Sequence, residues 1–429
     1  MSVTTRSAEP PVEAQAHGPR RAWAAVVLLA VVGTLNYADR FLPAVLAEPI
    51  KHDLALSDTA IGVINGFGFL AVYAVLGIAI ARIADSGAFG LVISVCLGLW
   101  GAMTMVGGAV HSGVQLALTR VGVAVGEAGS TPAAHAYVAR NFAPERRAAP
   151  LAVITLAIPL ASAASLIGGG LLAESFGWRT TFVVMGAISV VFAPVVLAVL
   201  GRRQSMPTAE RSPQDRTTRP WHVLRAPSYL IIVTGAACIS VAGYSLTTFA
   251  PAFLVRHHGL SLGEVGLQYG IASGVTGILG LLVVGRVADR LAARDPRWLL
   301  WLVAAMTAAL LPCSVAAFLV GSPMVCVVLI SLAYVIGTAY MAPSIAAIQR
   351  LVVPELRATA SAVFLFFGAI VGAAGPFVTG LISDALTAEL GSQALGRALL
   401  IVVPAMQLAA VVCYLAASRR FLRDTLDAA

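Results

Sequence analysis

Two charged residues lie within an apolar stretch that is long enough to cross a lipid bilayer. Arg120 and Glu127 both fall between residues 113 and 139. A charge at mid-membrane costs at least a few kcal/mol, so it usually faces a cavity and has a partner. Seven residues make about two helical turns, so both side chains project from one face of a helix. We expect this face to border a polar cavity inside the membrane.

A further acid, Asp39, lies in the first apolar stretch, within the run Asn-Tyr-Ala-Asp-Arg at 36–40. If the first helix runs outward and the fourth inward, Asp39 and Arg120 lie roughly 8 and 10 Å below the same membrane surface. An ion pair between them is therefore geometrically feasible, with Glu127 lying deeper. Two acids around one arginine leave one net negative charge, which a proton can neutralise.

We therefore expect Asp39, Arg120 and Glu127 to take up and release a proton. The alternative is a purely structural ion pair that holds the first and fourth helices in register. The neighbouring Arg40 is expected to extend to the outer membrane interface, or to pack, rather than to join this set.

The composition is that of an integral membrane protein. Of 429 residues, 59% are hydrophobic and only 11% are charged, whereas soluble domains contain about 25% charged residues. The net charge of +8 comes from basic residues scattered among short loops, which does not favour nucleic-acid binding. There is no phosphate-binding glycine loop and no nucleophile–base set, so we expect neither an ATP-driven pump nor an enzyme. The five cysteines lack metal-ligand spacing, so we expect no metal or cofactor, with the proton as the only coupling ion.

Windows of about 20 apolar residues predict an all-α membrane protein with twelve transmembrane helices. Their expected positions are residues 22–44, 59–83, 88–109, 113–139, 148–173, 177–200, 227–255, 262–286, 298–320, 323–348, 358–386 and 393–417. An arginine- and proline-containing linker at 201–226 separates an N-terminal six-helix bundle, 22–200, from a C-terminal one, 227–417. Short tails at 1–21 and 418–429 complete the chain.

The distribution of basic residues predicts the orientation. With both termini in the cytoplasm, 22 of the 28 lysines and arginines lie on the cytoplasmic side. The four expected outside are Lys51, Arg179, Arg256 and Arg397. We therefore expect a multi-pass protein of the plasma membrane with both tails cytoplasmic.

The two halves repeat each other in sequence. The run ARIADS at 81–86 is echoed by GRVADR at 285–290, and PERRAAPLAV at 144–153 by PELRATASAV at 354–363. A same-direction duplication of six helices is typical of a major facilitator, which places its substrate near the midplane between the halves. We expect charged residues at the cytoplasmic ends of the second and eighth helices to brace an inner gate: Arg82, Asp85, Arg286, Asp289 and Arg290.

Other polar and aromatic residues of the central spans are candidates for lining the cavity, although each could instead serve packing. Together with Arg120 and Glu127 they are Tyr37, Thr131, Tyr244, Thr247, Phe249, Tyr340, Met341 and Ser344. The second half contributes almost no mid-membrane charge. This set favours an amphipathic substrate with one polar head over a sugar, which needs many hydrogen-bond partners.

Several motifs resemble Spinster-like members of the major facilitator superfamily, and the likeness covers nearly all of 22–417. They include Asn-Tyr-Ala-Asp-Arg-Phe at 36–41, Glu-Pro-Ile-Lys at 48–51, Gly-Glu-Ala-Gly at 126–129 and Arg-Asp-Pro-Arg-Trp at 294–298. One departure is the loop at 85–90, which lacks both arginines of the superfamily's usual Asp-Arg-x-Gly-Arg pattern. The resemblance implies alternating-access transport of a lysophospholipid- or sphingosine-phosphate-like lipid. It also assigns proton sensing to Asp39, with Arg120 and Glu127 as partners.

Two other functions remain open from the sequence. Some of these motifs also occur in organic-anion:cation symporters, in which Arg120 would clamp a small anionic substrate. The same fold could also serve a non-coupled facilitator or scramblase. Import and export would use the same parts, and we expect the protein to act as a monomer.

Overall fold

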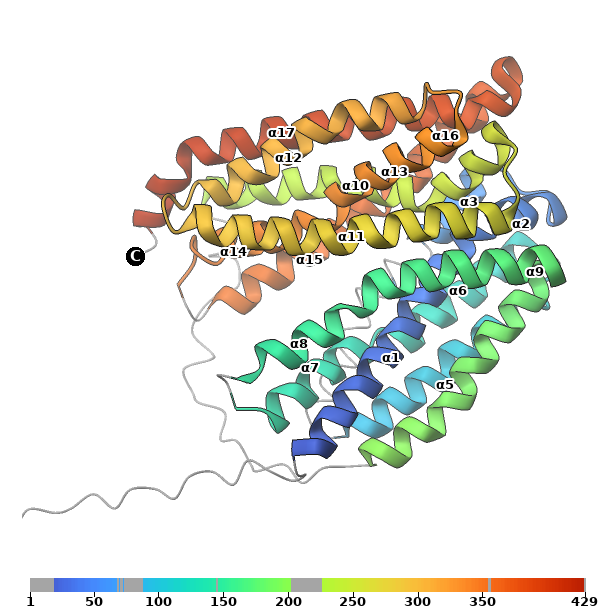
Figure 1. Cartoon of the computed structure of the whole chain (residues 1–429), viewed down its shortest axis with the longest axis horizontal. Helices are drawn as coiled ribbons and strands as arrows, with labels where there is room; N and C mark the ends of the chain where they lie inside the picture. Colours follow the sequence, from blue (N-terminus) through green and yellow to red (C-terminus); the bar gives the residue numbers. More distant parts are fainter. Residues whose placement is uncertain are drawn as a thin grey trace, which may run out of the picture.

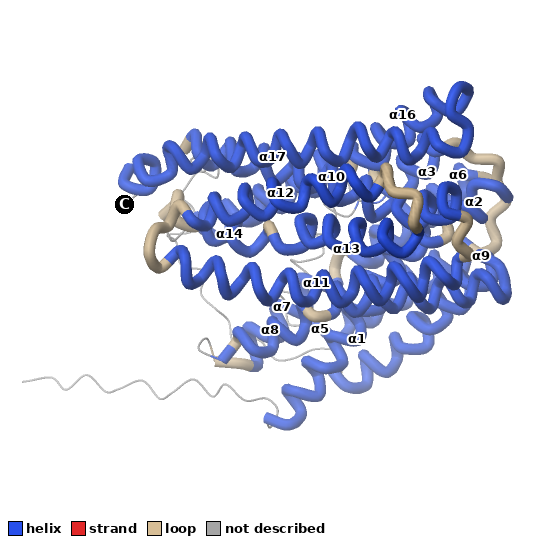
Figure 2. The backbone as a smooth tube through the Cα atoms, turned by 45° about the horizontal axis from the view of Figure 1, so that its top comes forward, coloured by secondary structure: helices blue, strands red, loops and turns tan. Residues whose placement is uncertain are grey.

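The structure is a computed structural model that describes residues 19–67, 69, 72, 88–143, 146–201, 226–353 and 356–427. Within these ranges every regular element is a helix, which confirms the predicted all-α class. Figure 2 shows long helices joined by short loops.

The N-terminal half begins with α1 (Pro19–Val45) and the short α2 (Ala47–Asp53) and α3 (Asp58–Asn65). It continues through α5 (Phe89–Gly107), α6 (Gly113–Glu127), α7 (Ser130–Asn141), α8 (Ala148–Thr155) and α9 (Ala157–Leu200). The C-terminal half contains α10 (Pro227–His258), α11 (Leu262–Ala292), α12 (Trp298–Ala317), α13 (Pro323–Ala339), α14 (Met341–Ile348), α15 (Arg357–Gly372), α16 (Ala374–Leu390), a 3-10 turn (Gly391–Gln393) and α17 (Ala394–Asp427).

Eight helical stretches of the described chain are long and apolar enough to cross a membrane. Two of them, Ala149–Leu200 and Thr359–Thr425, run for 52 and 67 residues, which is more than twice the roughly 20 residues that one crossing needs. Helix α9 breaks at Gly177, whose φ of +79° is readily adopted only by glycine. The break falls where the sequence predicts one span to end and the next to begin.

The last helix extends past its predicted end at residue 417 and continues to Asp427. The Asp424 carboxylate accepts a hydrogen bond of 2.8 Å from the backbone N–H of Ser228 in the first turn of α10. The end of α17 therefore caps α10, and part of the predicted C-terminal tail is helical.

The helices form two bundles, α1–α9 and α10–α17, which lie side by side (Figure 1). They meet mainly through the pairs α9–α11, α3–α16 and α1–α10. We call the end that holds α2, α3 and the break at Gly177 the outer end, because the arginine distribution predicts it to be external. Helices α7, α8, α14 and α15 lie toward the opposite end in Figure 1.

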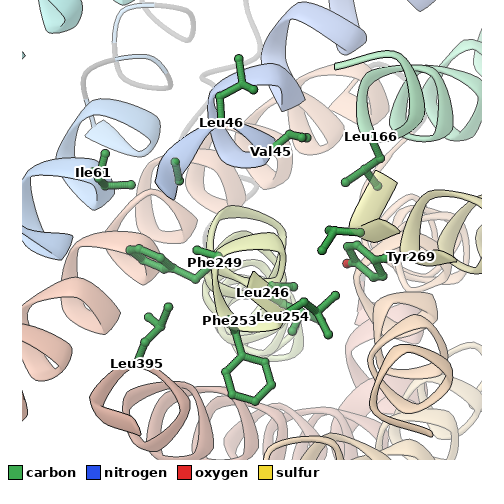
Figure 3. Close-up of a cluster of buried hydrophobic side chains, with 14 of the residues drawn as sticks. Val45, Leu46, Ile61, Leu166, Leu246, Phe249, Phe253, Leu254, Tyr269 and Leu395 are labelled. Carbon is green, nitrogen blue, oxygen red and sulfur yellow. The ribbon is translucent and has the colours of Figure 1, made fainter. Parts of the chain in front are cut away.

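An apolar cluster joins the two bundles at the outer end (Figure 3). Leu46 and Ile61 contribute from the N-terminal half, and Phe249, Phe253 and Leu254 from α10, all of them buried. Within a membrane, apolar side chains gain little from leaving lipid, so helices associate through close packing. At this cluster, close packing of the side chains therefore contributes more to the association of the two bundles than their apolar character does.

Glycines bring the backbones of the two bundles into direct contact. A Cβ at Gly62 of α3 would lie 2.3 Å from the carbonyl oxygen of Pro376 on α16. A Cβ at Gly266 of α11 would lie 2.4 Å from the carbonyl oxygen of Leu166 on α9. The two crossings are equivalent, because Gly62 and Gly266 are separated by the same 204 residues as the repeated ARIADS and GRVADR runs.

We predict that Gly62→Ala or Gly266→Ala keeps the two bundles from closing fully at the outer end. The added methyl group would overlap a backbone carbonyl, and such overpacking costs about 1–3 kcal/mol. Distances between spin labels on the two outer surfaces should lengthen in both variants. Gly168→Ala is the matched control, because a Cβ there meets no atom within 4 Å, and an equal lengthening in this control would contradict the prediction.

Candidate functional site

Four charged side chains of α1 and α6 form one buried cluster inside the N-terminal bundle. Arg40 Nη2 lies 2.8 Å from Glu127 Oε2, and Arg120 Nη1 lies 3.5 Å from Asp39 Oδ2. Glu127 is fully buried, while Arg120 and Asp39 are 2% and 3% exposed. The predicted Asp39–Arg120 contact is thus present, and Glu127 lies in the same cluster.

Arg40 differs from its prediction. It does not extend to the membrane interface but donates from Nε and Nη2 to Glu127 Oε2, at 3.1 and 2.8 Å. Its guanidinium also lies over the rings of Tyr37 and Phe69, at 4.7 and 4.9 Å from their centres. The physical reason is Glu127: a buried carboxylate without a counter-charge is strongly unfavourable, and Arg40 is long enough to reach it.

Including Arg40 changes the charge balance of the cluster. The sequence-based reasoning counted two acids around one arginine, but the structure places two carboxylates beside two guanidiniums. The fully ionised cluster is therefore neutral, and one added proton makes it positive.

Thr104 of α5 is a member of the site that the sequence analysis missed. Its hydroxyl lies 2.8 Å from both carboxylate oxygens of Asp39, and Arg120 Nη2 donates to the Asp39 carbonyl oxygen at 3.4 Å. The signal available in the sequence was slight, because Thr104 is one of two hydroxyl residues in the apolar span 88–109. Thr104 fixes the orientation of the Asp39 carboxylate.

Three buried polar atoms of the cluster and its surroundings have no hydrogen-bond partner among the described residues. They are Glu127 Oε1, Arg120 Nε and Asn36 Nδ2. Buried polar atoms are nearly always paired with protein or water. One acceptor and two donors are therefore available here to a proton, a water molecule or a polar group of a substrate.

The predicted cavity residues fall into separate environments. Thr247 lines a small pocket between the two bundles, together with Phe41, Ser162, Leu166, Tyr269 and Tyr334. Tyr37 contacts Arg40 of the cluster. Phe249 is buried in the cluster of Figure 3.

The remaining candidates lie elsewhere. The Tyr340 hydroxyl lies 3.0 Å from Ser240 Oγ, and Ser344 Oγ lies 2.6 Å from the Tyr414 hydroxyl. Met341 is exposed, and Thr131 and Tyr244 are half-buried. The structure therefore brings Tyr37 to the charged cluster and Thr247 to the pocket, and it places Phe249 and Tyr340 among packed side chains.

Of the five predicted inner-gate residues, Arg286, Asp289 and Arg290 are exposed near the end of α11. Arg82 and Asp85 lie outside the described residues. The inner gate therefore remains a prediction.

A second charged group, which we call the outer network, consists of Glu48, Lys51, Asp58 and Arg256. Arg256 of α10 donates to both carboxylate oxygens of Asp58, at 2.6 and 2.7 Å, and to Glu48 at 2.6 Å. Lys51 Nζ lies 2.6 Å from Asp58. These contacts join α2 and α3 of one half to α10 of the other, so they hold the outer end closed. Lys51 and Arg256 were expected on the outer side, but no contact among the four residues was predicted from the sequence.

Asp58 lies just before the predicted span 59–83. The pH at which its carboxylate takes up a proton determines where its contribution to closure is lost. Burial alone would raise the pKa of Asp58, but hydrogen bonds from Arg256, the charge of Arg256, and hydrogen bonds from Lys51 and Ser383 hold this pKa well below its ordinary value of 3.8. A carboxylate with a lowered pKa stabilises the closed form above its ordinary pKa, and the contribution is lost as the pH falls through the lowered value.

We therefore predict that the contribution of Asp58 to closure is constant from about pH 8 to about pH 5 and weakens only in stronger acid. Outer distances between spin labels in an Asp39→Asn, Glu127→Gln background should show this plateau. A shift between about pH 5 and pH 8 in that background would contradict the assignment.

Comparison with known proteins agrees with this architecture. Residues 29–376 match the model of the Major Facilitator Superfamily, so the chain belongs to this superfamily of membrane transporters. The MFS-type efflux pump of Mycolicibacterium smegmatis is 69% identical over 416 residues, which are 97% of either chain. Human protein spinster homolog 1 is 27% identical over 395 residues, 86% of this chain and 74% of the human one.

A solved structure is similar over almost the whole fold. It is the crystal structure of a bacterial homolog to the human lysosomal transporter Spinster, in an inward-facing and unoccupied conformation. The TM-score is 0.85 at 26% identity, and the match covers 95% of this chain and 99% of the other. The predicted resemblance to Spinster-like transporters is thus confirmed. The chain is a multi-pass transporter of the inner membrane.

Proposed function

We propose that this transporter uses a proton gradient to export amphipathic organic molecules with one polar head. The observation that carries the proposal is the buried cluster of Asp39, Arg40, Arg120 and Glu127, with Glu127 Oε1 unpaired among the described residues. Intramembrane charges of this kind mark ion or substrate pathways in transporters.

The cluster supplies a coupling step through its charge balance. A proton on Glu127 removes the charge that holds Arg40, and a proton on Asp39 removes the charge that holds Arg120. Either event leaves one guanidinium without a counter-ion in a low-dielectric site, where it attracts an anionic group or favours a rearrangement of α1 against α6. Protonation and substrate binding are thereby linked through the same arginines.

The small pocket supports the amphipathic class of substrate. Its lining combines apolar Phe41 and Leu166 with the hydroxyl groups of Ser162, Thr247 and Tyr334, drawn from both bundles. Such a surface suits a mainly apolar molecule that needs few hydrogen bonds. A lysophospholipid- or sphingosine-phosphate-like lipid is a molecule of this class. It is larger than the pocket, so the two bundles would have to separate further to admit it.

The direction of transport rests on the comparisons and on the predicted orientation. The most similar of the relatives described above is named an efflux pump. If both termini are cytoplasmic, the outer network closes the side away from the cytoplasm, and a carrier of this form would load from the cytoplasm or the inner leaflet. The similarity to a solved inward-facing structure supports this direction.

The test is energised transport in everted membrane vesicles. A fluorescent lysophospholipid should accumulate inside the vesicles when a proton gradient is imposed, and a protonophore should abolish the accumulation. Equilibration without accumulation would instead indicate a facilitator or scramblase.

One observation favours the alternative of an organic-anion:proton symporter. Arg120 Nε is a buried donor without a partner among the described residues, as expected for a residue that clamps a carboxylate. Saturable uptake of a small carboxylate that Arg120→Ala abolishes, without any lipid accumulation, would support this alternative.

A further inference from the structure

Two acidic side chains reach across the interface between the bundles to the start of a helix in the opposite half. Asp384 of α16 accepts hydrogen bonds from the backbone N–H groups of Asp58 and Thr59, at 2.9 and 2.8 Å, and from the Thr59 hydroxyl at 2.5 Å. Glu174 of α9 accepts one from the backbone N–H of Gly263 at 2.8 Å. The first contact joins the C-terminal half to α3, and the second joins the N-terminal half to α11.

These contacts satisfy donors that a helix cannot satisfy by itself. The first four N–H groups of a helix have no partner within it. At both helices a serine N-cap satisfies the third residue: Ser57 accepts from the N–H of Ala60, and Ser261 from that of Glu264. The N–H of the second residue, Thr59 or Gly263, is left to the carboxylate from the opposite half.

The arrangement is duplicated along with the fold. Ser57 and Ser261 are separated by the 204 residues of the first sequence repeat, and Glu174 and Asp384 by the 210 residues of the second. Two independent positions therefore perform the same task in symmetry-related places. Gly263 allows the close approach, because a Cβ there would lie within van der Waals overlap of Glu174 Oε2.

We infer that Glu174 and Asp384 are positioning residues for the transport cycle, which cap α11 and α3 only while the outer end is closed. When the bundles separate at this end, each helix loses a carboxylate that both accepts its hydrogen bonds and complements its dipole. The pair therefore biases the carrier toward the conformation that is closed outside.

The two caps differ in strength. Asp384 accepts three hydrogen bonds and Glu174 accepts one. Replacing the carboxylate by an amide should raise the ratio of outer-open to outer-closed molecules about tenfold for Asp384→Asn and about threefold for Glu174→Gln.

Distances between spin labels measure this ratio directly. Labels at Ala109→Cys and Ser392→Cys, in a background without native cysteines, place one probe on an exposed outer loop of each half. The measurement needs neither substrate nor proton gradient, so its outcome is independent of the proposed export function.

Two matched controls separate the contact across the interface from a local change in charge. Glu264 accepts a hydrogen bond from the Ser261 backbone at the start of α11, so Glu264→Gln removes a charge there without touching the other half. Glu389→Gln does the same for an exposed acid of α16. Both controls should keep the distances of the unmodified protein.

The inference is overturned if Glu174→Gln and Asp384→Asn leave the outer distances unchanged, or if Glu264→Gln lengthens them as much as Glu174→Gln does. Glu174 is exposed, so its replacement leaves folding intact even if Asp384→Asn lowers the protein yield.

Discussion

Replacing Arg40 by alanine should unfold the transporter at a lower temperature and abolish transport against a gradient. The substitution leaves the Glu127 carboxylate, which is fully buried, without its counter-charge. Removing one partner of a buried ion pair costs about 3–5 kcal/mol. Thermal unfolding in detergent and transport in proteoliposomes would show the two effects. An equivalent loss in Arg294→Ala, at an exposed position in the loop after α11, would show that the effect is not specific to the cluster.

A double variant distinguishes the effect of Arg40 on stability from its effect on proton coupling. Adding Glu127→Gln to Arg40→Ala removes the unpaired charge, so most of the lost stability should return. Transport should not return, because the carboxylate that we propose to exchange the proton is absent. If Arg40→Ala alone keeps both full stability and full transport, then Arg40 has no role in the charged cluster.

Replacing Arg256 by alanine should shift the carrier strongly toward an outer-open conformation. Arg256 holds Asp58 and Glu48 of the opposite half, and the Asp58 side chain is fully buried. Without Arg256 the closed form contains a buried carboxylate whose remaining cationic partner, among the described residues, is Lys51. The cost of about 3–5 kcal/mol corresponds to at least a hundredfold change in the ratio of closed to open molecules.

Outer distances between spin labels would measure this change. Arg179→Ala is the control, because Arg179 pairs with Asp53 within the N-terminal half and both side chains are partly exposed. Arg256→Ala should lengthen the distances and Arg179→Ala should not. Equal distances in the two variants would show that the outer network does not govern closure.

The sequence predicts those features that depend on local composition. Apolar stretches of about 20 residues must become helices in a membrane, since only helices and barrels satisfy their own backbone there. This requirement explains why the all-α class is predictable, and why the break at Gly177 falls between two expected spans. The sequence also places Asp39 and Arg120 at similar depths, because helical rise fixes the depth of each residue, and this makes their contact feasible.

Rotation about the helix axis is less predictable than depth. Asp39 and Arg40 are neighbours that point about 100° apart, and Arg40 was expected to extend to the membrane interface or to pack. The Arg40 side chain is long enough to reach Glu127 despite this angle. Likewise, Thr247 and Phe249 lie about 200° apart on α10, so they could not both face one cavity, and only Thr247 lines the pocket.

Contacts between the halves were the hardest to predict. Asp58 and Arg256 are separated by 198 residues, and each lies near the end of a helix, where a charged residue is normally solvated. They meet at the outer end, where the glycine crossings also bring the two bundles together. The pattern of serine N-caps and glycines at a constant offset was present in the sequence, but its meaning depends on how the halves are docked.

The central claim is that the buried cluster couples protons to substrate, and proton movement in proteoliposomes tests it most directly. Purified protein is reconstituted with a pH-sensitive dye, a lysophospholipid is added, and the wild type is compared with Asp39→Asn and Glu127→Gln. We expect a substrate-dependent proton signal in the wild type that both variants lose. Substrate transport without any proton signal in the wild type, or an undiminished signal in both variants, would contradict it.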